Sequence, residues 1–195
     1  MVDKIWISVF ALLSLIWAAC SESSPSGVEA DVNVFMDPRD SHEYRIIEIG
    51  GRVWMAENLD YYNAEDSLQD RSFCFKDSSV YCEKQGRLYQ WNLAMKACPE
   101  GWRLPSKVDF DSLIAAVGGY EFAADSLKSL GFISNVQGGY YFMGYFNYFD
   151  EYAYFWTRDE VRNLNARSVM LEKGRSSVSF DETYEEFALS VRCVR

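Results

Sequence analysis

The residues of this chain with the greatest capacity for chemistry are its five cysteines and its single histidine. A cysteine can carry a lipid, form a disulfide, bind a metal or act as a nucleophile, and its surroundings decide among these roles. Cys20 differs from the other four because it directly follows the apolar run Ile5–Ala19, which ends in two alanines. At fifteen residues, the run is shorter than the roughly 20 residues of a membrane-spanning helix and has the length of a signal-peptide core.

Small residues followed by cysteine at the end of such a run resemble a bacterial lipobox, in which the cysteine is acylated before cleavage. We therefore expect residues 1–19 to be a lipoprotein signal peptide and Cys20 to attach the protein to a membrane through its lipid. Trp17 departs from the pattern, since an aliphatic residue usually stands three positions before the cysteine. Cleavage after Ala19 without acylation is the alternative. Ser21, where aspartate is absent, favours the outer membrane of the cell envelope by resemblance to lipoprotein sorting.

Residues 20–39 are rich in serine, proline, glycine and acidic residues, and we expect them to form a flexible tether to a globular domain at 40–195. Export would place Cys74, Cys82, Cys98 and Cys193 in an oxidising compartment, where three pairings are open. Cys74 and Cys82 flank a short polar loop that a disulfide would close. Cys98 and Cys193 would then tie the first half of the domain to its last strand.

No residue pattern in the chain predicts catalysis, a cofactor or a metal site. A Ser-His-Asp or Cys-His arrangement would need His42, which lies in a polar segment leading into the domain. No C-x-x-C spacing occurs, and the glycine pairs lack the spacing of a phosphate-binding loop. The formal charge of −10 argues against nucleic acid as a partner. We therefore expect a protein that is not an enzyme.

The elements that must position these residues follow an α+β order, with helices before a run of strands. A hairpin is predicted from Tyr44–Ile49 and Arg52–Met55, joined by Gly50-Gly51. The apolar spacing predicts helices over 87–97, 106–117 and 123–130, of which the second begins with a capping-box-like Ser-x-x-Asp. Short strands are predicted over 140–146, 152–157, 166–171, 176–180 and 188–194.

Four stretches together resemble one family: IIEIGGRVWMAENLDY, GRLYQWNLAMKACPEGWRLPS, YFWTRDE and SVRCVR. They are similar to the Fibrobacter succinogenes major paralogous domain, and the resemblance covers about residues 40–195. It implies a C-type lectin-like fold, with short helices packed on small antiparallel sheets. It also implies one pairing of the cysteines, Cys74–Cys82 and Cys98–Cys193. The sequence carries no calcium-and-sugar signature of the true C-type lectins.

The stretch Gly138–Trp156 has the clearest functional character, because eleven of its 19 residues are aromatic. Tyrosine suits recognition, since it offers apolar area and a hydroxyl with little rotamer entropy. Tyr140, Tyr145, Tyr148 and Tyr152 are the candidate ligand-binding residues. The alternative is that these rings form core strands, as we expect for Phe155 and Trp156 near the end of the stretch.

Two functions from different classes follow from these patterns. The first is an envelope or cell-surface lipoprotein whose lectin-like domain binds a glycan or protein ligand without catalysis, and it predicts a patch of exposed tyrosines. The second is a structural envelope lipoprotein that acts through protein contacts, and it predicts that the same rings are buried. The exposure of the tyrosine-rich stretch discriminates between them.

Overall fold

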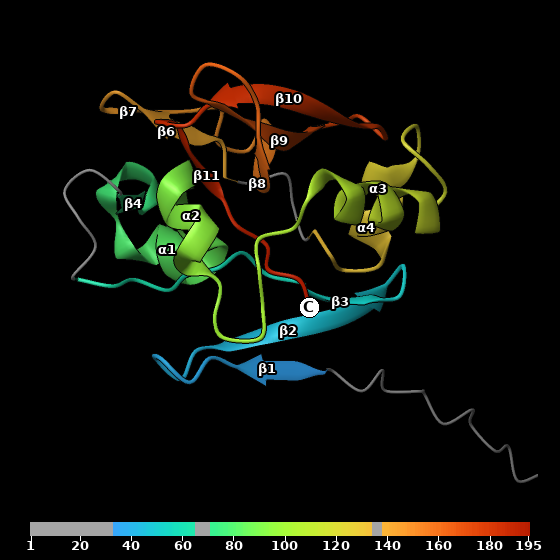
Figure 1. The fold of residues 1–195 in the computed structure, drawn as a ribbon, viewed down its shortest axis with the longest axis horizontal. Coiled ribbons are helices and arrows are strands. Elements are labelled where there is room, and N and C mark those ends of the chain that lie inside the picture. Colours follow the sequence, from blue (N-terminus) through green and yellow to red (C-terminus); the bar gives the residue numbers. More distant parts are fainter. Residues whose placement is uncertain (1–32, 65–70, 134–137) are drawn as a thin grey trace, which may run out of the picture. The chain divides into compact units, whose positions relative to one another are not determined.

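The computed structural model describes residues 33–64, 71–133 and 138–195 (Figure 1). The predicted signal peptide (residues 1–19), the predicted lipidation site Cys20 and most of the predicted tether lie outside these ranges. The fold is α+β, as expected. Its sheets are built from β1 Val34–Met36, β2 Glu43–Ile49, β3 Arg52–Met55, β4 Ser72–Phe73, β5 Leu88–Gln90, β6 Tyr140–Phe142, β7 Tyr145–Asn147, β8 Tyr152–Glu160, β9 Asn165–Glu172, β10 Val178–Tyr184 and β11 Ala188–Ser190. Its helices are α1 Ser79–Gln85, α2 Trp91–Ala97, α3 Lys107–Ala116 and α4 Ala123–Ser129.

The smaller sheet is antiparallel and has the order β1-β2-β3. The predicted hairpin is confirmed, because Gly50 and Gly51 turn between β2 and β3 with φ of 63° and 72°. The predicted tether is too long at its C-terminal end. Val34–Met36 pairs with β2 and belongs to the folded domain, since the backbone of this short apolar segment completes the edge of the sheet.

The larger sheet has the order β10-β9-β8-β11-β5-β4, and β6 and β7 branch from β11. Its pairs are antiparallel except β8 with β11, which are parallel at Phe155 and Ser190. The predicted strand 140–146 is in fact two strands, because Met143 and Gly144 form a turn with positive φ at both positions. β11 is shorter than the predicted 188–194, since residues after Ser190 leave this sheet.

Helices α3 and α4 both match their predictions to within one residue at each end. Ser106 accepts from the Asp109 backbone N–H, and the Asp109 side chain accepts from the Ser106 backbone N–H, which completes the capping box. The predicted helix 87–97 is helical only from Trp91 to Ala97. Leu88–Gln90 forms β5 because its backbone pairs with β4 and β11 on either side, and the helix begins at Trp91. Helix α1 was not predicted from the sequence.

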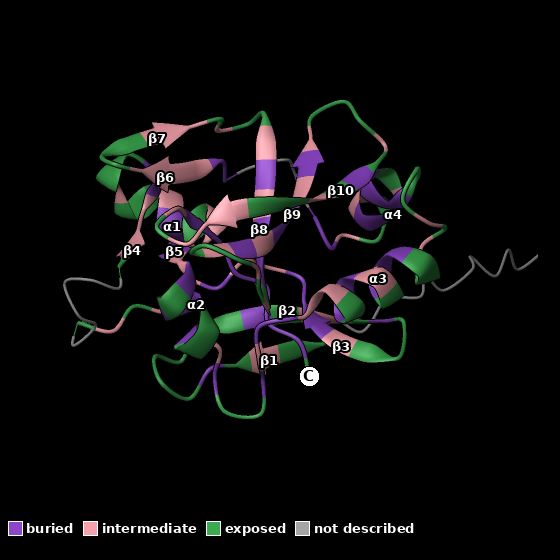
Figure 2. Cartoon of the chain, turned by 45° about the horizontal axis from the view of Figure 1, so that its top comes forward, coloured by how far each residue is buried: buried purple, intermediate pink, exposed green. Residues whose placement is uncertain are grey.

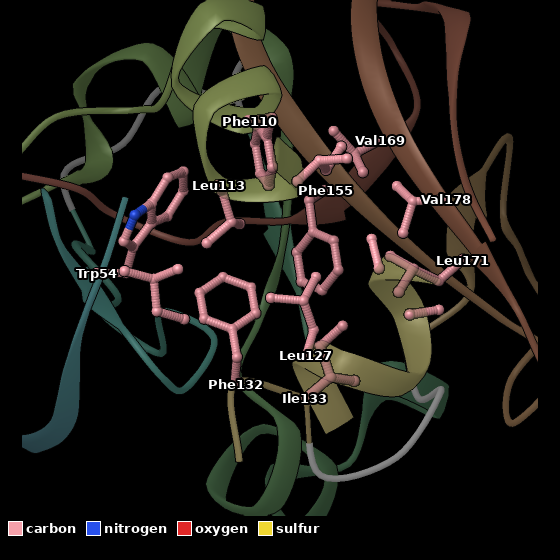
Figure 3. Packing of buried hydrophobic residues seen from close by; sticks show 14 of the residues in the cluster. Trp54, Phe110, Leu113, Leu127, Phe132, Ile133, Phe155, Val169, Leu171 and Val178 are labelled. Atoms are coloured by element: carbon pink, nitrogen blue, oxygen red, sulfur yellow. The ribbon is translucent and has the colours of Figure 1, made fainter. Parts of the chain in front are cut away.

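The main core cluster lies between the smaller sheet, α3, α4 and one face of β8 and β9 (Figure 3). Trp54 from β3 packs against Phe110 of α3 and against Phe132, with ring centroids 5.2 and 5.7 Å apart. A second cluster lies around α2, β5 and β11 and includes Trp91, Trp102 and Trp156. Burial of these rings explains why so short a set of helices and strands holds together.

Both disulfides expected from the family resemblance are present. Cys74 pairs with Cys82, and Cys98 pairs with Cys193, with Cα–Cα distances of 5.0 and 5.8 Å. Beyond β11 the C-terminal segment, residues 191–195, runs from the larger sheet to β3 (Figure 1). Val53 and Arg195 each donate a backbone hydrogen bond to the other's carbonyl there. Within the described ranges, no helix has the length and apolar character needed to cross a bilayer.

Candidate functional site

The tyrosine-rich stretch divides between the core and the surface because β8 alternates between two faces. Ala153 and Phe155 point into the main core, and both are almost fully buried. Tyr152 and Tyr154 point to the opposite face and are half-buried. The expectation that Phe155 lies in the core is therefore confirmed. Tyr152 and Tyr154 instead border an exposed surface on the other side of β8.

Trp156 shows where that surface ends. By alternation it lies on the same face as Tyr154, yet it is fully buried. Its indole Nε1 donates to the Tyr89 carbonyl at 2.7 Å, and Trp91 Nε1 donates to the Thr157 carbonyl at 2.8 Å. β5 and α2 thus cover the middle of β8. Its start, with Tyr152 and Tyr154, is left half-buried.

Seven rings from three parts of the sheet form one connected surface, which we call the aromatic face. They are contributed by the β6–β7 hairpin and its following loop, by β8, and by the end of β10 with the residues after it. Its members are Tyr140, Phe142, Tyr148, Tyr152, Tyr154, Tyr184 and Phe187. Each member contacts at least one other, and Figure 2 shows β6 and β7 largely in the intermediate and exposed colours.

Tyr140 and Phe187 lie at the centre of the aromatic face. Tyr140 contacts Tyr148, Tyr154 and Phe187 with centroid distances of 5.6, 5.9 and 4.8 Å. Phe187 also stacks on Phe142 at 4.0 Å with an interplanar angle of 11°. These contacts hold the rings in fixed orientations, so a ligand that stacks on them meets a surface that is already ordered.

Gly139 is the residue that lets the hairpin take this position. Its φ is +55°, and a Cβ added there would lie 2.0 Å from the Asn147 carbonyl oxygen. Its N–H donates to the Tyr152 carbonyl, and the Tyr152 N–H donates to the Tyr148 carbonyl. The close approach that only glycine permits therefore fixes Tyr140 and Tyr148 against the start of β8.

A pocket of about 290 Å³ opens on the aromatic face. Tyr140, Tyr154, Tyr184 and Phe187 supply its rings, and its polar lining comes from Asn165, Asp181, Glu182 and Thr183. Among the described residues that line it there is no histidine, cysteine or lysine. Its volume is at the lower end of the about 300–1,000 Å³ typical of small-molecule sites.

Burial raises the pKa of Tyr154 to about 12 and also raises the pKa of Tyr140. Both hydroxyls therefore stay protonated at neutral pH and can donate hydrogen bonds. Asp181 is exposed and can accept them, whereas the side chain of Glu182 alternates to the opposite face of β10, where it forms an ion pair with Arg167 at 3.8 Å. The pocket therefore offers ring faces beside hydroxyl donors and carboxylate acceptors, which is a combination for binding a flat, hydroxyl-rich molecule.

The four tyrosines predicted as ligand-binding residues do not all reach this pocket. Tyr140 lines it, and Tyr148 and Tyr152 extend the aromatic face beside it. Tyr145 pairs with Phe142 and so lies on the same face of the hairpin, but its side chain is 72% exposed and does not line the pocket. The sequence did not predict Tyr184 and Phe187 as binding residues, because only the β9–β10 pairing brings them beside the β6–β7 hairpin.

The sequence matches the Fibrobacter succinogenes major domain over residues 47–195, which is most of the chain. The chain belongs to this family. No curated protein and no solved structure matches the chain. The matched region of this chain contains both disulfides and all the residues of the aromatic face, whereas β1 and the start of β2 lie before residue 47. The C-type lectin-like relation stays a prediction.

Proposed function

We propose that the chain is a non-catalytic binding module that holds a glycan on the aromatic face. The observation that carries the proposal is the connected set of half-buried rings around a pocket with carboxylate and hydroxyl groups. Sugar rings have flat apolar faces edged by hydroxyls, so they can stack on tyrosine while donating to Asp181.

Two further observations support binding over the alternative of a purely structural role. A structural role predicts that the tyrosines are buried, whereas Tyr145 and Tyr148 are 72% and 48% exposed. Catalysis has little support, because the four cysteines of the described residues are all in disulfides and His42 is not in the lining of this pocket. In this proposal the lipid on Cys20 attaches the module to the cell envelope, in the outer membrane, and presents the aromatic face to its ligand.

Screening tests the proposal directly. The purified full-length chain is applied to a microarray of β-glucans, xylans, mannans, galactans and peptidoglycan, and the strongest ligand is then titrated by calorimetry. We expect at least one saturable ligand. We expect Tyr148→Ala and Tyr154→Ala each to weaken it by roughly tenfold, in line with about 1–1.5 kcal/mol per ring contact.

Tyr62→Ala is the matched control, because Tyr62 is 58% exposed and lies outside the aromatic face. Its affinity should equal that of the unchanged chain. Melting temperatures of all variants show whether a loss comes from unfolding. If no polysaccharide binds while an envelope protein is captured by the same chain, the glycan proposal is wrong.

A further inference from the structure

A second cavity lies away from the aromatic face and has a different chemical character. This polar cleft, of about 160 Å³, is bordered by the start of β2, the loop after β3, the end of α1 and the C-terminal segment. Six of its lining residues matter for its chemistry: Arg45, Glu57, Asn58, Asp60, Gln85 and Arg192. None of the residues that line the pocket of the aromatic face also lines this cleft.

Arg192 is the unusual residue of the polar cleft, because its side chain is almost completely removed from solvent. The residue is 5% exposed, and its guanidinium lies 4.8 Å from the Phe132 ring centroid and 5.3 Å from that of Phe155. Its Nε donates to Asn58 Oδ1 at 2.6 Å, and its Nη1 donates to the Phe132 carbonyl. These two bonds use only part of its five N–H groups.

No carboxylate among the described residues pairs with Arg192, although buried arginines are usually paired. Glu57, the acid whose charge acts on Arg192, is already engaged, since it accepts from the Arg45 backbone N–H at 2.9 Å and from Arg45 Nε at 3.1 Å. Burial lowers the pKa of Arg192 to about 9, which still leaves the group charged at neutral pH. The cleft therefore holds a buried positive charge whose counter-charge the described chain does not supply.

Two hydrogen-bond acceptors of the same cleft also lack partners. Asp60 Oδ1 and Gln85 Oε1 are buried, and neither accepts a hydrogen bond in the described structure. Asn58 connects this part of the cleft to the guanidinium of Arg192. Its Nδ2 donates to the backbone carbonyl of Gln85 at 2.8 Å, and its Oδ1 accepts from Arg192 Nε. Buried acceptors without donors are costly, so a ligand that donates to them gains more than it would at an exposed site.

The charges of the lining limit what the ligand can be. Four acidic residues (Glu43, Glu57, Asp60, Glu83) and three basic ones (Arg45, Lys84, Arg192) give a formal sum of −1 with His42 neutral. Arg192 is the one buried positive charge of the described lining without a paired carboxylate, so the cleft can balance a single negative charge but not the two of a phosphate dianion. The small volume restricts the bound group to about one sugar ring or one amino acid.

We propose that the polar cleft binds a small monocarboxylate that also carries hydroxyl or ammonium donors. Arg192 pairs with the carboxylate, and Asp60 and Gln85 accept from the donors. A hexuronic acid and a free α-amino acid both have this chemistry. The inference is independent of the glycan proposal, because it uses different residues and a different cavity.

The test is a calorimetric titration of the purified full-length chain with D-galacturonate, D-galactose and L-serine. D-galactose lacks only the carboxylate of D-galacturonate, so we expect it to bind at least tenfold more weakly. Binding of galacturonate alone identifies the acidic sugar as the source of the carboxylate, and binding of serine alone identifies the amino acid. If neither acid binds saturably at millimolar concentrations, or galactose binds as well as galacturonate, the proposal is wrong.

Two variants assign the binding to the polar cleft. Arg192→Gln should weaken the bound acid at least tenfold, whereas the matched change Arg175→Gln, at an arginine outside the cleft, and Tyr148→Ala on the aromatic face should not. Arg192 also holds the Phe132 carbonyl, so Arg192→Gln can fail to fold. Gln85→Leu removes an acceptor that has no partner, and we expect it to keep the melting temperature while weakening binding severalfold. Unchanged affinity in Gln85→Leu contradicts the proposal whatever the fate of Arg192→Gln.

Discussion

The aromatic face with its pocket and the polar cleft are two regions of one small domain that differ in shape, charge and burial. The aromatic face is an open surface whose rings contact one another, and its polar groups lie at its edges. The polar cleft is smaller and contains a buried charge with unpartnered acceptors. Stacking tolerates many ligands with a flat face, whereas a buried guanidinium requires one particular charge. The comparison suggests broad selection at one site and narrow selection at the other.

The two regions also depend on different parts of the chain. The aromatic face takes most of its rings from the continuous stretch 140–154, held by Gly139. The polar cleft joins segments far apart in sequence, and the Arg192–Asn58 hydrogen bond spans 134 positions. Cys193 follows Arg192 and is tied to Cys98, so this disulfide holds the cleft's central residue in place. Perturbations can therefore be aimed at one region at a time.

The largest expected effect is that of removing the Cys98–Cys193 disulfide by a double change to serine. It closes a loop of 95 residues, and loss of that constraint on the unfolded chain costs about 4–5 kcal/mol of unfolding free energy. The matched pair Cys74→Ser with Cys82→Ser opens a loop of only 8 residues and should cost about 2–3 kcal/mol. Urea unfolding of both variants measures the difference. Equal losses would contradict the loop-length explanation.

A smaller and local effect is expected from Gly139→Ala. The added Cβ would lie 2.0 Å from the Asn147 carbonyl oxygen, so the hairpin must shift at a cost of about 1–3 kcal/mol. Glycan binding at the aromatic face should fall, while binding of a carboxylate in the polar cleft should persist. Gly144→Ala is the control, because Gly144 also has positive φ but its Cβ would meet nothing within 4 Å. Loss of both ligands together would show that the two regions are not independent.

The smallest effect is expected at alkaline pH and is specific to the aromatic face. The pKa of Tyr154 in the folded chain is about 12, above the usual 10 of an unfolded chain. Its contribution to stability is therefore complete below about pH 10 and is lost as the pH rises through 12. Tyr154→Phe should therefore make the decline of unfolding free energy between pH 10 and 12 less steep. Tyr145→Phe, at a 72% exposed position, should leave that decline unchanged.

Local signals predicted the parts of the fold that depend on neighbouring residues. The Gly50-Gly51 turn and the capping box of Ser106 with Asp109 are complete within a few residues, so their predictions are confirmed. Backbone pairing between segments far apart in the sequence determined the elements that were predicted incorrectly. Leu88–Gln90 has a helical apolar pattern but forms a strand, because β4 and β11 both supply backbone partners. The C-terminal strand ends early because the smaller sheet takes residues 193–195.

The same distinction explains which site could be anticipated. Tyrosines close together in sequence drew attention to the aromatic face, although its pocket needs Tyr184 and Phe187 from another part of the chain. Nothing in the sequence pointed to the polar cleft. Arg192 stands in a block that the family resemblance identified, but its burial and its link to Asn58 follow only from the packing of distant segments.

The hydrogen bonds between Val53 and Arg195 have a consequence for how the domain folds. The free edge of β3 in the β2–β3 hairpin cannot be paired until residues 193–195, about 140 positions later in the chain, have reached it. Such long-range closure slows folding and makes it cooperative, because the entropy of ordering the whole chain is lost before these contacts form. A chain that lacks residues 193–195 cannot complete this edge of the smaller sheet, so we expect it to remain incompletely folded.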